Sequence, residues 1–235
     1  MTASPGHAVL TSGSRNFGNE HPRGNGPETY RVFVAISLPE RVKDEIERAQ
    51  EQLSSGLPGK CVRWARREQF HLTLKFLGNV ELQRLEALMA SIRGACAGCG
   101  VLQLRAGQIG FFPNARRPRV VWTRVRDGRD WLPSLQRAVE TAAAGFTGEA
   151  PEPKFTGHVT LGRCRMITRV QAEMLSTLAK VMEDRVFGEW TADRLEIIRS
   201  QLSPGGSRYT TLASLPLAPP SRRGGSVTPP PPPAC

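Results

Sequence analysis

The amino-acid sequence predicts an α+β protein of two similar lobes, each with an antiparallel sheet backed by helices. Strand-like and helix-like segments alternate along residues 28–217, which is typical of mixed folds. In addition, the pattern His-x-Thr-Leu occurs twice, at His71 and at His158, both times in a strand-like run. The separation of 87 residues is about the length of one lobe. We therefore expect one copy of the pattern in each lobe, with the lobes related by a pseudo-twofold axis.

The first half of the chain is expected to run strand, helix, two extended segments and helix. TYRVFVAISL at 29–38 is a predicted strand, because it is rich in β-branched and aromatic residues. A helix is predicted over 39–53, where a proline opens an amphipathic pattern. CVRW and FHLTLKFLG follow as extended segments. A second helix is predicted over 81–96, because its apolar residues form one stripe, Leu82, Leu85, Leu88, Met89 and Ile92.

The second half repeats this logic. Residues 101–112 and 119–125 are predicted to form a hairpin across a Pro-Asn-Ala-Arg-Arg-Pro loop, and a helix over 128–144 follows. HVTLGR, which holds the second pattern, is a predicted strand before a helix over 168–184. The chain closes with a predicted hairpin of 193–202 and 207–217 over Ser-Pro-Gly-Gly.

The two ends of the chain differ from this central part in composition. Residues 1–27 are rich in Gly, Ser, Asn and Pro and lack apolar periodicity, and residues 218–235 are rich in proline. We expect a disordered leader and a disordered tail around a single domain at 28–217. The sequence contains no run of 18 apolar residues and no secretory signal pattern, so we expect a cytoplasmic protein that does not enter membranes. Separately, we expect a monomer.

The cysteines and histidines do not suggest a metal site. The five cysteines are unevenly spaced, which is a poor framework for disulfides and predicts free thiols. Cys96 and Cys99 form a CxxC pair, but the second ligand pair that a zinc site needs is not visible. Both repeated histidines are followed by threonine and not by another ligand type. We therefore expect chemistry without a metal or a cofactor.

The repeated pattern places a histidine and a threonine on one face of a strand. Successive side chains of a strand point to opposite faces, so His71 shares a face with Thr73, and His158 with Thr160. The apolar face of the first strand is expected to carry Leu72, Leu74 and Phe76. Taken alone, a histidine in an apolar run is more often a core residue. The pair of patterns, however, predicts two polar faces that meet in one cleft.

The charge of the chain points to a polyanionic partner. With 32 Lys and Arg against 21 Asp and Glu, the formal net charge is +11 and the sequence pI about 10.3, which favours RNA or DNA above all. Lys75 is expected on the same strand face as His71. The basic residues near the two patterns predict a rim that attracts phosphate: Lys60, Arg63, Arg66, Arg67, Lys75, Arg163 and Arg165.

Several segments together resemble a known family. TYRVFVAISLP, the Arg-Trp before QFHLTLKFLG, the FF and PRVVW hairpin, FTGHVTLGR and SPGGSRYTTL are similar to the bacterial 2′-5′ RNA ligase group. These proteins are RNA 2′,3′-cyclic phosphodiesterases of the 2H phosphoesterase superfamily. The resemblance implies a bilobed LigT-like fold. It also implies hydrolysis of RNA 2′,3′-cyclic phosphate ends, tRNA fragments included, to 2′-phosphates, and the reverse joining of RNA ends through a 2′-5′ linkage.

The resemblance also implies roles for the site residues. His71 would be the proton donor and His158 the proton acceptor, while Thr73, Thr160 and Arg163 would hold phosphate oxygens. Opening a cyclic phosphodiester needs a base and an acid on opposite sides of phosphorus, and histidine suits both tasks because its ordinary pKa is about 6.5. Arg163 lies five positions after His158, so a regular strand would turn it away from the phosphate. A bulge permitted by the preceding glycine would return it.

Two other classes of function stay open. An enzyme of the same superfamily could act on small cyclic nucleotides, on ADP-ribose cyclic phosphate or on 2′-5′ oligonucleotides. Alternatively, the chain is a non-catalytic RNA-binding module whose histidines are structural. The sequence lacks an RRM aromatic signature, which weighs against such a module. Trp64 and Phe76 are the candidates for stacking on a base.

Overall fold

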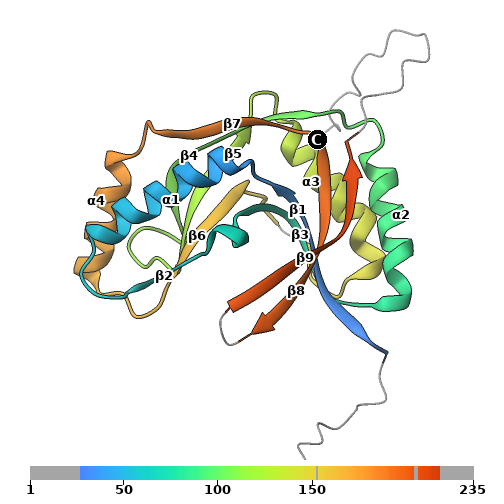
Figure 1. Cartoon of the computed structure of the whole chain (residues 1–235), viewed down its shortest axis with the longest axis horizontal. Coiled ribbons are helices and arrows are strands. Elements are labelled where there is room, and N and C mark those ends of the chain that lie inside the picture. The colour runs from blue at the N-terminus through green and yellow to red at the C-terminus, as the bar shows by residue number, and fades with distance from the viewer. Residues whose placement is uncertain (1–26, 152, 204–205, 218–235) are drawn as a thin grey trace, which may run out of the picture.

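The structure is a computed structural model that describes residues 27–151, 153–203 and 206–217 (Figure 1). The predicted leader at 1–27, apart from Pro27, and the predicted tail at 218–235 lie outside the described residues. Strands form the middle of the molecule, and α-helices lie towards its two ends. Within the described ranges, the structure has no helix long and apolar enough to cross a membrane.

The described strands form one antiparallel sheet that divides into two lobes. The first lobe has the strand order β3-β1-β8-β9 and consists of β1 (Thr29–Ser37), β3 (His71–Glu81), β8 (Arg194–Ser203) and β9 (Gly206–Pro216). The second lobe has the order β7-β4-β5-β6 and consists of β4 (Leu102–Phe112), β5 (Val120–Asp127), β6 (His158–Cys164) and β7 (Val186–Ala192), with β2 (Val62–Trp64) paired to β6. The lobes join where β3 pairs with β6.

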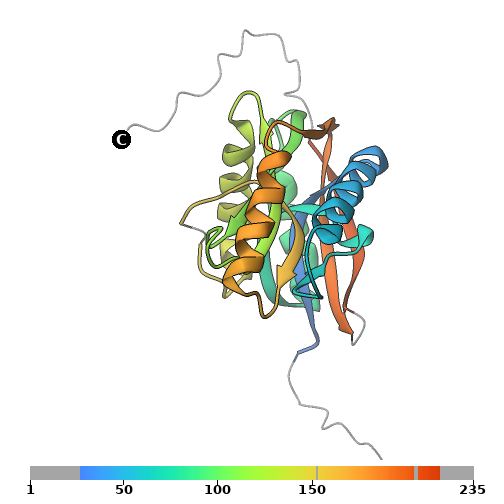
Figure 2. The same cartoon turned by 90° about the vertical axis from the view of Figure 1, so that its left-hand side faces the viewer.

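Helices cover the outer side of each lobe. The first lobe carries α2 (Leu85–Cys96) and α3 (Trp131–Ala143), and the second carries α1 (Glu40–Ser55) and α4 (Arg169–Val181). The two pairs lie at opposite ends in Figure 1, and α4 with α1 beside it faces the viewer in Figure 2. The structure therefore has the predicted bilobed arrangement with one pattern in each lobe. The lobes are not consecutive in the chain, because α1 belongs to the second lobe and β8 and β9 return to complete the first.

Most predicted elements are present with shifted ends, and one strand is new. The helix predicted over 81–96 starts as a 3₁₀ turn and becomes α2 at Leu85. The helix predicted over 128–144 begins at Trp131, where the Asp127 carboxylate accepts hydrogen bonds from the N–H groups of Trp131 and Leu132 at 2.7 and 2.8 Å. Strand β7 is absent from the predictions. It is short and contains Gly188 at a φ of +148°, and glycine weakens a strand pattern.

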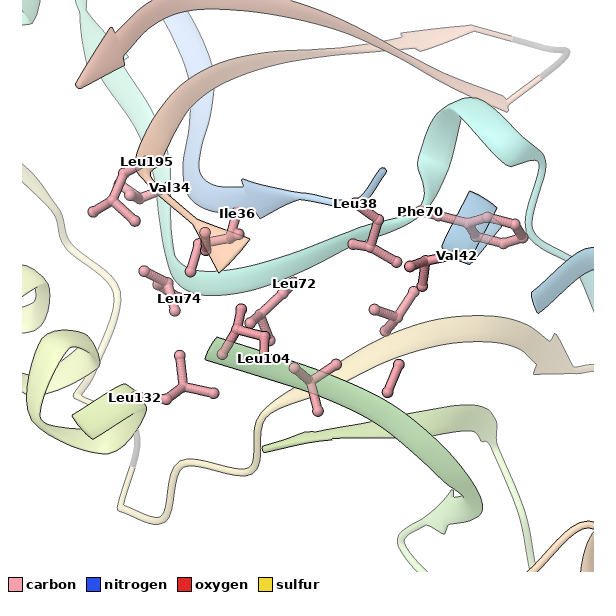
Figure 3. Close-up of a cluster of buried hydrophobic side chains, with 14 of the residues drawn as sticks. Val34, Ile36, Leu38, Val42, Phe70, Leu72, Leu74, Leu104, Leu132 and Leu195 are labelled. Atoms are coloured by element: carbon pink, nitrogen blue, oxygen red, sulfur yellow. The ribbon is translucent and has the colours of Figure 1, made fainter. Parts of the chain in front are cut away.

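The core lies between the sheet and its helices and extends across the junction of the lobes. Figure 3 shows part of it, with Val34, Ile36, Leu72, Leu74, Leu104, Leu132 and Leu195 among the labelled side chains. Leu72 and Val159 pair across the junction, and both are 0% exposed. Burial of such a side chain stabilises the fold by about 1.5–3 kcal/mol. This junction therefore fixes the two repeated patterns relative to each other.

Candidate active site

A cleft of about 610 Å³ opens between the two lobes. It brings together all five residues singled out in the sequence, because its lining includes His71, Thr73, His158, Thr160 and Arg163. Each of these residues comes from β3 or β6, the strands that meet at the junction. The site therefore depends on both lobes and on their fixed relation.

The pairing of β3 with β6 explains how the two patterns converge. Leu72 lies directly opposite Val159, and both side chains are buried in the core. Because the strands are antiparallel, the histidine of each pattern lies towards the threonine of the other. The polar residues flank the buried pair in sequence and take the opposite face, where they line the cleft. The predicted alternation thus holds through both patterns.

A β-bulge follows each pattern at the same position. The register of β3 against β1 contains an extra residue at Leu74, and a second one further along the strand at Leu77. The register of β6 against β5 contains one extra residue, Leu161. A bulge reverses the alternation of the side chains beyond it. Arg163 therefore returns to the face of His158 and lines the cleft, as expected from the glycine that precedes it.

The bulge at Leu74 makes two predictions for β3 wrong. Phe76, expected on the core face, is 49% exposed and lines the cleft. Lys75, expected on the cleft face, is 3% exposed, and its ammonium group donates hydrogen bonds to the Glu140 carboxylate and, at 3.1 Å, to the carbonyl oxygen of Ala150. A buried charge needs such partners. Lys75 thus belongs to the scaffold behind the site and not to the phosphate rim.

Two buried glutamines contact the bulges from the helices behind them. The side-chain amide of Gln50 in α1 donates a hydrogen bond to the carbonyl oxygen of Leu161 at 2.7 Å. The side-chain amide of Gln136 in α3 donates to the carbonyl oxygen of Leu74 at 3.4 Å. Gln50 is 8% exposed and Gln136 is 6% exposed. The same contact between helix and bulge therefore occurs in both lobes.

His71 packs between two aromatic rings on the first lobe. Its ring centroid lies 4.7 Å from that of Phe33 and 5.2 Å from that of Tyr209. Burial lowers the pKa of His71 to about 4. A hydrogen bond to the backbone of Gln69 acts in the opposite direction, and the nearby His158 lowers the pKa further. The ring is therefore neutral near pH 7 when no anion is bound.

His158 has a matching environment on the second lobe. Its ring centroid lies 5.0 Å from that of Phe112 and 6.0 Å from that of Trp122. Its Nδ1 lies 2.7 Å from the carbonyl oxygen of Thr156 and therefore donates to it. Burial lowers the pKa of His158, this hydrogen bond opposes the effect, and Arg163 adds to it. In both patterns one ring nitrogen is engaged by the backbone two residues earlier, which leaves the other for the cleft.

Two arginines face each other at the edge of the cleft. Arg63 of β2 lies directly opposite Arg163 of β6, and like charges in this arrangement repel each other. Among the described residues, neither makes an ion pair. A bound phosphate would relieve the repulsion. Arg67 of the predicted rim, in contrast, is held by carboxylates of α1, namely those of Glu40, Asp44 and Glu47.

The aromatic residues around the histidines were not singled out in the sequence. They are Phe33, Phe112, Trp122 and Tyr209. Each lies in a segment that carries the family resemblance, which is the signal that could have identified them. Both candidates for base stacking, Trp64 and Phe76, line the cleft.

Comparisons with known proteins all find phosphoesterases of one family. The sequence model of the family described as LigT like Phosphoesterase matches residues 36–122, which include the first pattern. The RNA 2′,3′-cyclic phosphodiesterase of Aeropyrum pernix is 32% identical over 174 residues, 72% of this chain and 92% of that protein. The protein of the same name from Thermotoga maritima is 30% identical over 77% of this chain and 92% of its own length. The crystal structure of E. coli LigT in apo form is 25% identical, with a TM-score of 0.60 over 80% of this chain and 98% of that one.

Proposed function

This chain belongs to the LigT-like phosphoesterase family, and on that premise we propose that it hydrolyses the 2′,3′-cyclic phosphate ends of RNA to 2′-phosphomonoesters. The observation that carries the proposal is the meeting of two histidines, one from each lobe, in a cleft that also holds hydroxyl and guanidinium groups. The names of the Aeropyrum and Thermotoga relatives state the same activity. The net charge of +11 suits an RNA substrate.

In the proposed reaction the two histidines transfer protons on opposite sides of phosphorus. His158 takes a proton from water while the water oxygen attacks phosphorus and the P–O3′ bond breaks. His71 gives its proton to the departing O3′, so that the product carries a 2′-phosphate and a free 3′-hydroxyl. Thr73 and Thr160 donate hydrogen bonds to the non-bridging oxygens, and Arg163 adds charge-assisted donors. Each proton transfer contributes typically about 10²–10⁴ in rate.

The substrate itself helps to set the required protonation. Without a ligand, burial holds the pKa of both histidines below the ordinary value of 6.5. At neutral pH, His71 is therefore mostly unprotonated and has no proton to donate. A phosphate anion between the rings favours their charged forms and raises their pKa. Binding of the cyclic phosphate and protonation of the acid are therefore coupled.

The test incubates the chain, with EDTA present, with a short RNA that ends in a 2′,3′-cyclic phosphate. We expect a 2′-phosphate product, identified by its resistance to a 3′-specific phosphatase. His71→Asn and His158→Asn should each lower kcat by about 10²–10⁴ while RNA affinity is retained. Arg93→Gln, which removes a charge from α2 on the outer side of the first lobe, is the matched control. A 3′-phosphate product, or turnover that requires an added metal, would contradict the proposal.

The same experiment separates the remaining possibilities. A faster reaction with a small cyclic nucleotide, with ADP-ribose cyclic phosphate or with a 2′-5′ oligonucleotide would reassign the substrate. RNA binding without turnover would indicate a binding module. Supplying a second RNA with a 5′-hydroxyl end tests ligation, and tRNA fragments with cyclic ends test the proposed natural substrate. We further propose that residues 28–217 form the catalytic domain of a cytoplasmic monomer, which sedimentation and cell fractionation can check.

A further inference from the structure

A second pocket, of about 340 Å³, lies next to the catalytic cleft. Arg63 and Trp64 of β2 line both cavities, so the two adjoin the same strand. The second pocket, which we call the β2 pocket, is also lined by Lys60 and Arg165, which lie just outside β2 and β6. Neither histidine of the repeated pattern lines it. Its volume lies within the range of small-ligand sites.

The lining of the β2 pocket is positively charged. It contains Lys60, Arg63 and Arg165 and no acidic residue. Among the residues that the structure describes, none of these three cations makes an ion pair. Cations that line a concave surface without carboxylate partners concentrate anions, and phosphate groups in particular.

The opposite end of the catalytic cleft lacks this excess of positive charge. There the carboxylate of Glu149 lies close to Gly78 of β3. Arg31 of β1 lines the same end, because β1 pairs there with the residue after Gly78. The two side chains balance each other in charge. A polyanionic strand that leaves the catalytic centre is therefore attracted towards β2.

Trp64 supplies a flat apolar surface between the two cavities. It pairs with Gly162 of β6, and a Cβ atom on that glycine would lie 2.9 Å from the indole ring. The missing side chain thus lets the ring lie close to the β6 backbone. Stacking of a single-stranded base on such a ring contributes typically about 1–3 kcal/mol.

We propose that the β2 pocket binds the nucleotide that precedes the reacting 3′-terminal nucleotide of an RNA strand. The cyclic phosphate lies between the histidines, the next phosphate lies at Lys60 and Arg165, and the penultimate base stacks on Trp64. This inference rests on the proposed function and specifies a preference of the same site: an oligonucleotide gains contacts in the β2 pocket, whereas a mononucleotide occupies the catalytic cleft alone.

The test compares two substrates, adenosine 2′,3′-cyclic phosphate and a triadenylate that ends in the same cyclic phosphate. The double variant Lys60→Gln/Arg165→Gln alters residues that line only the β2 pocket. We expect its kcat/KM to fall about tenfold for the triadenylate and to stay within about twofold for the mononucleotide. The slope of log KM for the triadenylate against the logarithm of the salt concentration should also decrease by about 0.7 for each lost phosphate contact.

The control removes the same charge elsewhere. Arg93→Gln/Arg137→Gln changes exposed residues of α2 and α3, and both substrates should keep their rates. If kcat/KM of the double variant falls equally for both substrates, or for neither, the β2 pocket is not a subsite and the inference is overturned.

A binding measurement keeps the inference testable without turnover. The affinity of a fluorescent triadenylate with a 2′-phosphate end is measured by anisotropy for the unaltered chain, the double variant and Trp64→Leu. We expect binding to weaken about tenfold in each variant. If the unaltered chain cleaves neither substrate, the proposed function fails, but the anisotropy still tests the β2 pocket. Weaker binding by the variants supports the pocket as a binding site, and unchanged binding overturns the inference.

Discussion

His71 and His158 occupy matched positions but have different electrostatic surroundings. Each packs against aromatic rings and is hydrogen-bonded to the backbone two residues earlier. Only for His158 is a guanidinium group, that of Arg163, among the causes of the lowered pKa. A neighbouring positive charge favours the neutral ring, which is the form that a proton acceptor needs. The two copies of the motif are nearly symmetric in sequence, so this difference becomes visible only in the structure.

The surroundings of the histidines set the pH dependence of the reaction. In the proposed reaction His71 must be protonated to act as the acid, and its pKa in the free chain is lowered to about 4, so kcat/KM should decrease as pH rises through the acidic range. In the complex the phosphate anion raises this pKa, and the decrease of kcat should lie at higher pH. Steady-state kinetics from about pH 4 to about pH 9 measure the decrease of kcat/KM and the decrease of kcat. If both decreases occur at the same pH, the substrate anion does not control the protonation of the acid.

Sequence reasoning at this scale was correct where the strands are regular. Thr73 and Thr160 could be placed beside the histidines because the period of two in a strand decides which face a side chain takes. Lys75 and Phe76 could not be placed, because a bulge inverts the alternation and the side-chain pattern does not reveal it. In β6 a glycine gave a hint of the bulge, whereas β3 has no glycine next to Leu74.

The bulges are the elements that decide what the cleft contains. Each sets the residue five positions after the histidine on the cleft face, and each has its carbonyl oxygen bound by a buried glutamine of a helix. A buried carbonyl without a donor costs about 1–3 kcal/mol. The glutamines therefore stabilise the bulged backbone, and through it they position Arg163 and Phe76.

Replacement of Gln50 tests this positioning. Gln50→Leu removes the donor to Leu161 and to the carbonyl oxygen of Ala65, so that Arg163 is no longer held in place. We expect KM for the cyclic phosphate to rise about tenfold, with a smaller change in kcat. Gln52→Leu alters an exposed position of the same helix and should leave KM unchanged. A loss of folded protein with a normal KM in the remaining fraction would mean that Gln50 has only a structural role.

Prediction of elements succeeded where apolar periodicity is strong. The helices with a clear apolar stripe, α1 to α4, were found with ends shifted by a few residues. β7 was missed because its seven residues begin after a gap of only four residues from the end of α4 and include a glycine, so the strand pattern is brief. Its place at the end of the second lobe, next to β4, is decided by long-range pairing that local sequence does not specify.

At the scale of the whole molecule, the candidate site lies between lobes that meet at one strand junction. An anion bound in this cleft would contact groups from both lobes, so we expect it to bind the folded chain and not the unfolded one. Adenosine 2′-phosphate, an analogue of the product, should therefore stabilise the fold by about 2.7 kcal/mol at a concentration of 100 times its Kd.

Urea denaturation with increasing nucleotide measures this stabilisation. For Arg163→Gln, a higher concentration of adenosine 2′-phosphate should be needed to reach the same stabilisation. Adenosine without phosphate should stabilise the fold little. Equal stabilisation by adenosine would indicate that the base and not the phosphate is the main contact.

The two lobes could be predicted from the sequence, but their interleaving could not. The repeated motif and the alternation of elements indicate two similar units. The local sequence pattern does not indicate that α1 packs on the second lobe. It also does not indicate that β8 pairs with β1, which lies at the other end of the chain. Such pairing results from the total burial of apolar surface, which is a property of the whole fold.

Interleaving has a consequence for biosynthesis. Tyr209 packs edge-on against His71, and it lies in β9, the last strand of the first lobe. During translation, β1 and β3 leave the ribosome early, but the aromatic wall around His71 is complete only after β9 has been made. A nascent chain that stops before this strand therefore lacks the complete surroundings of His71 in the candidate site.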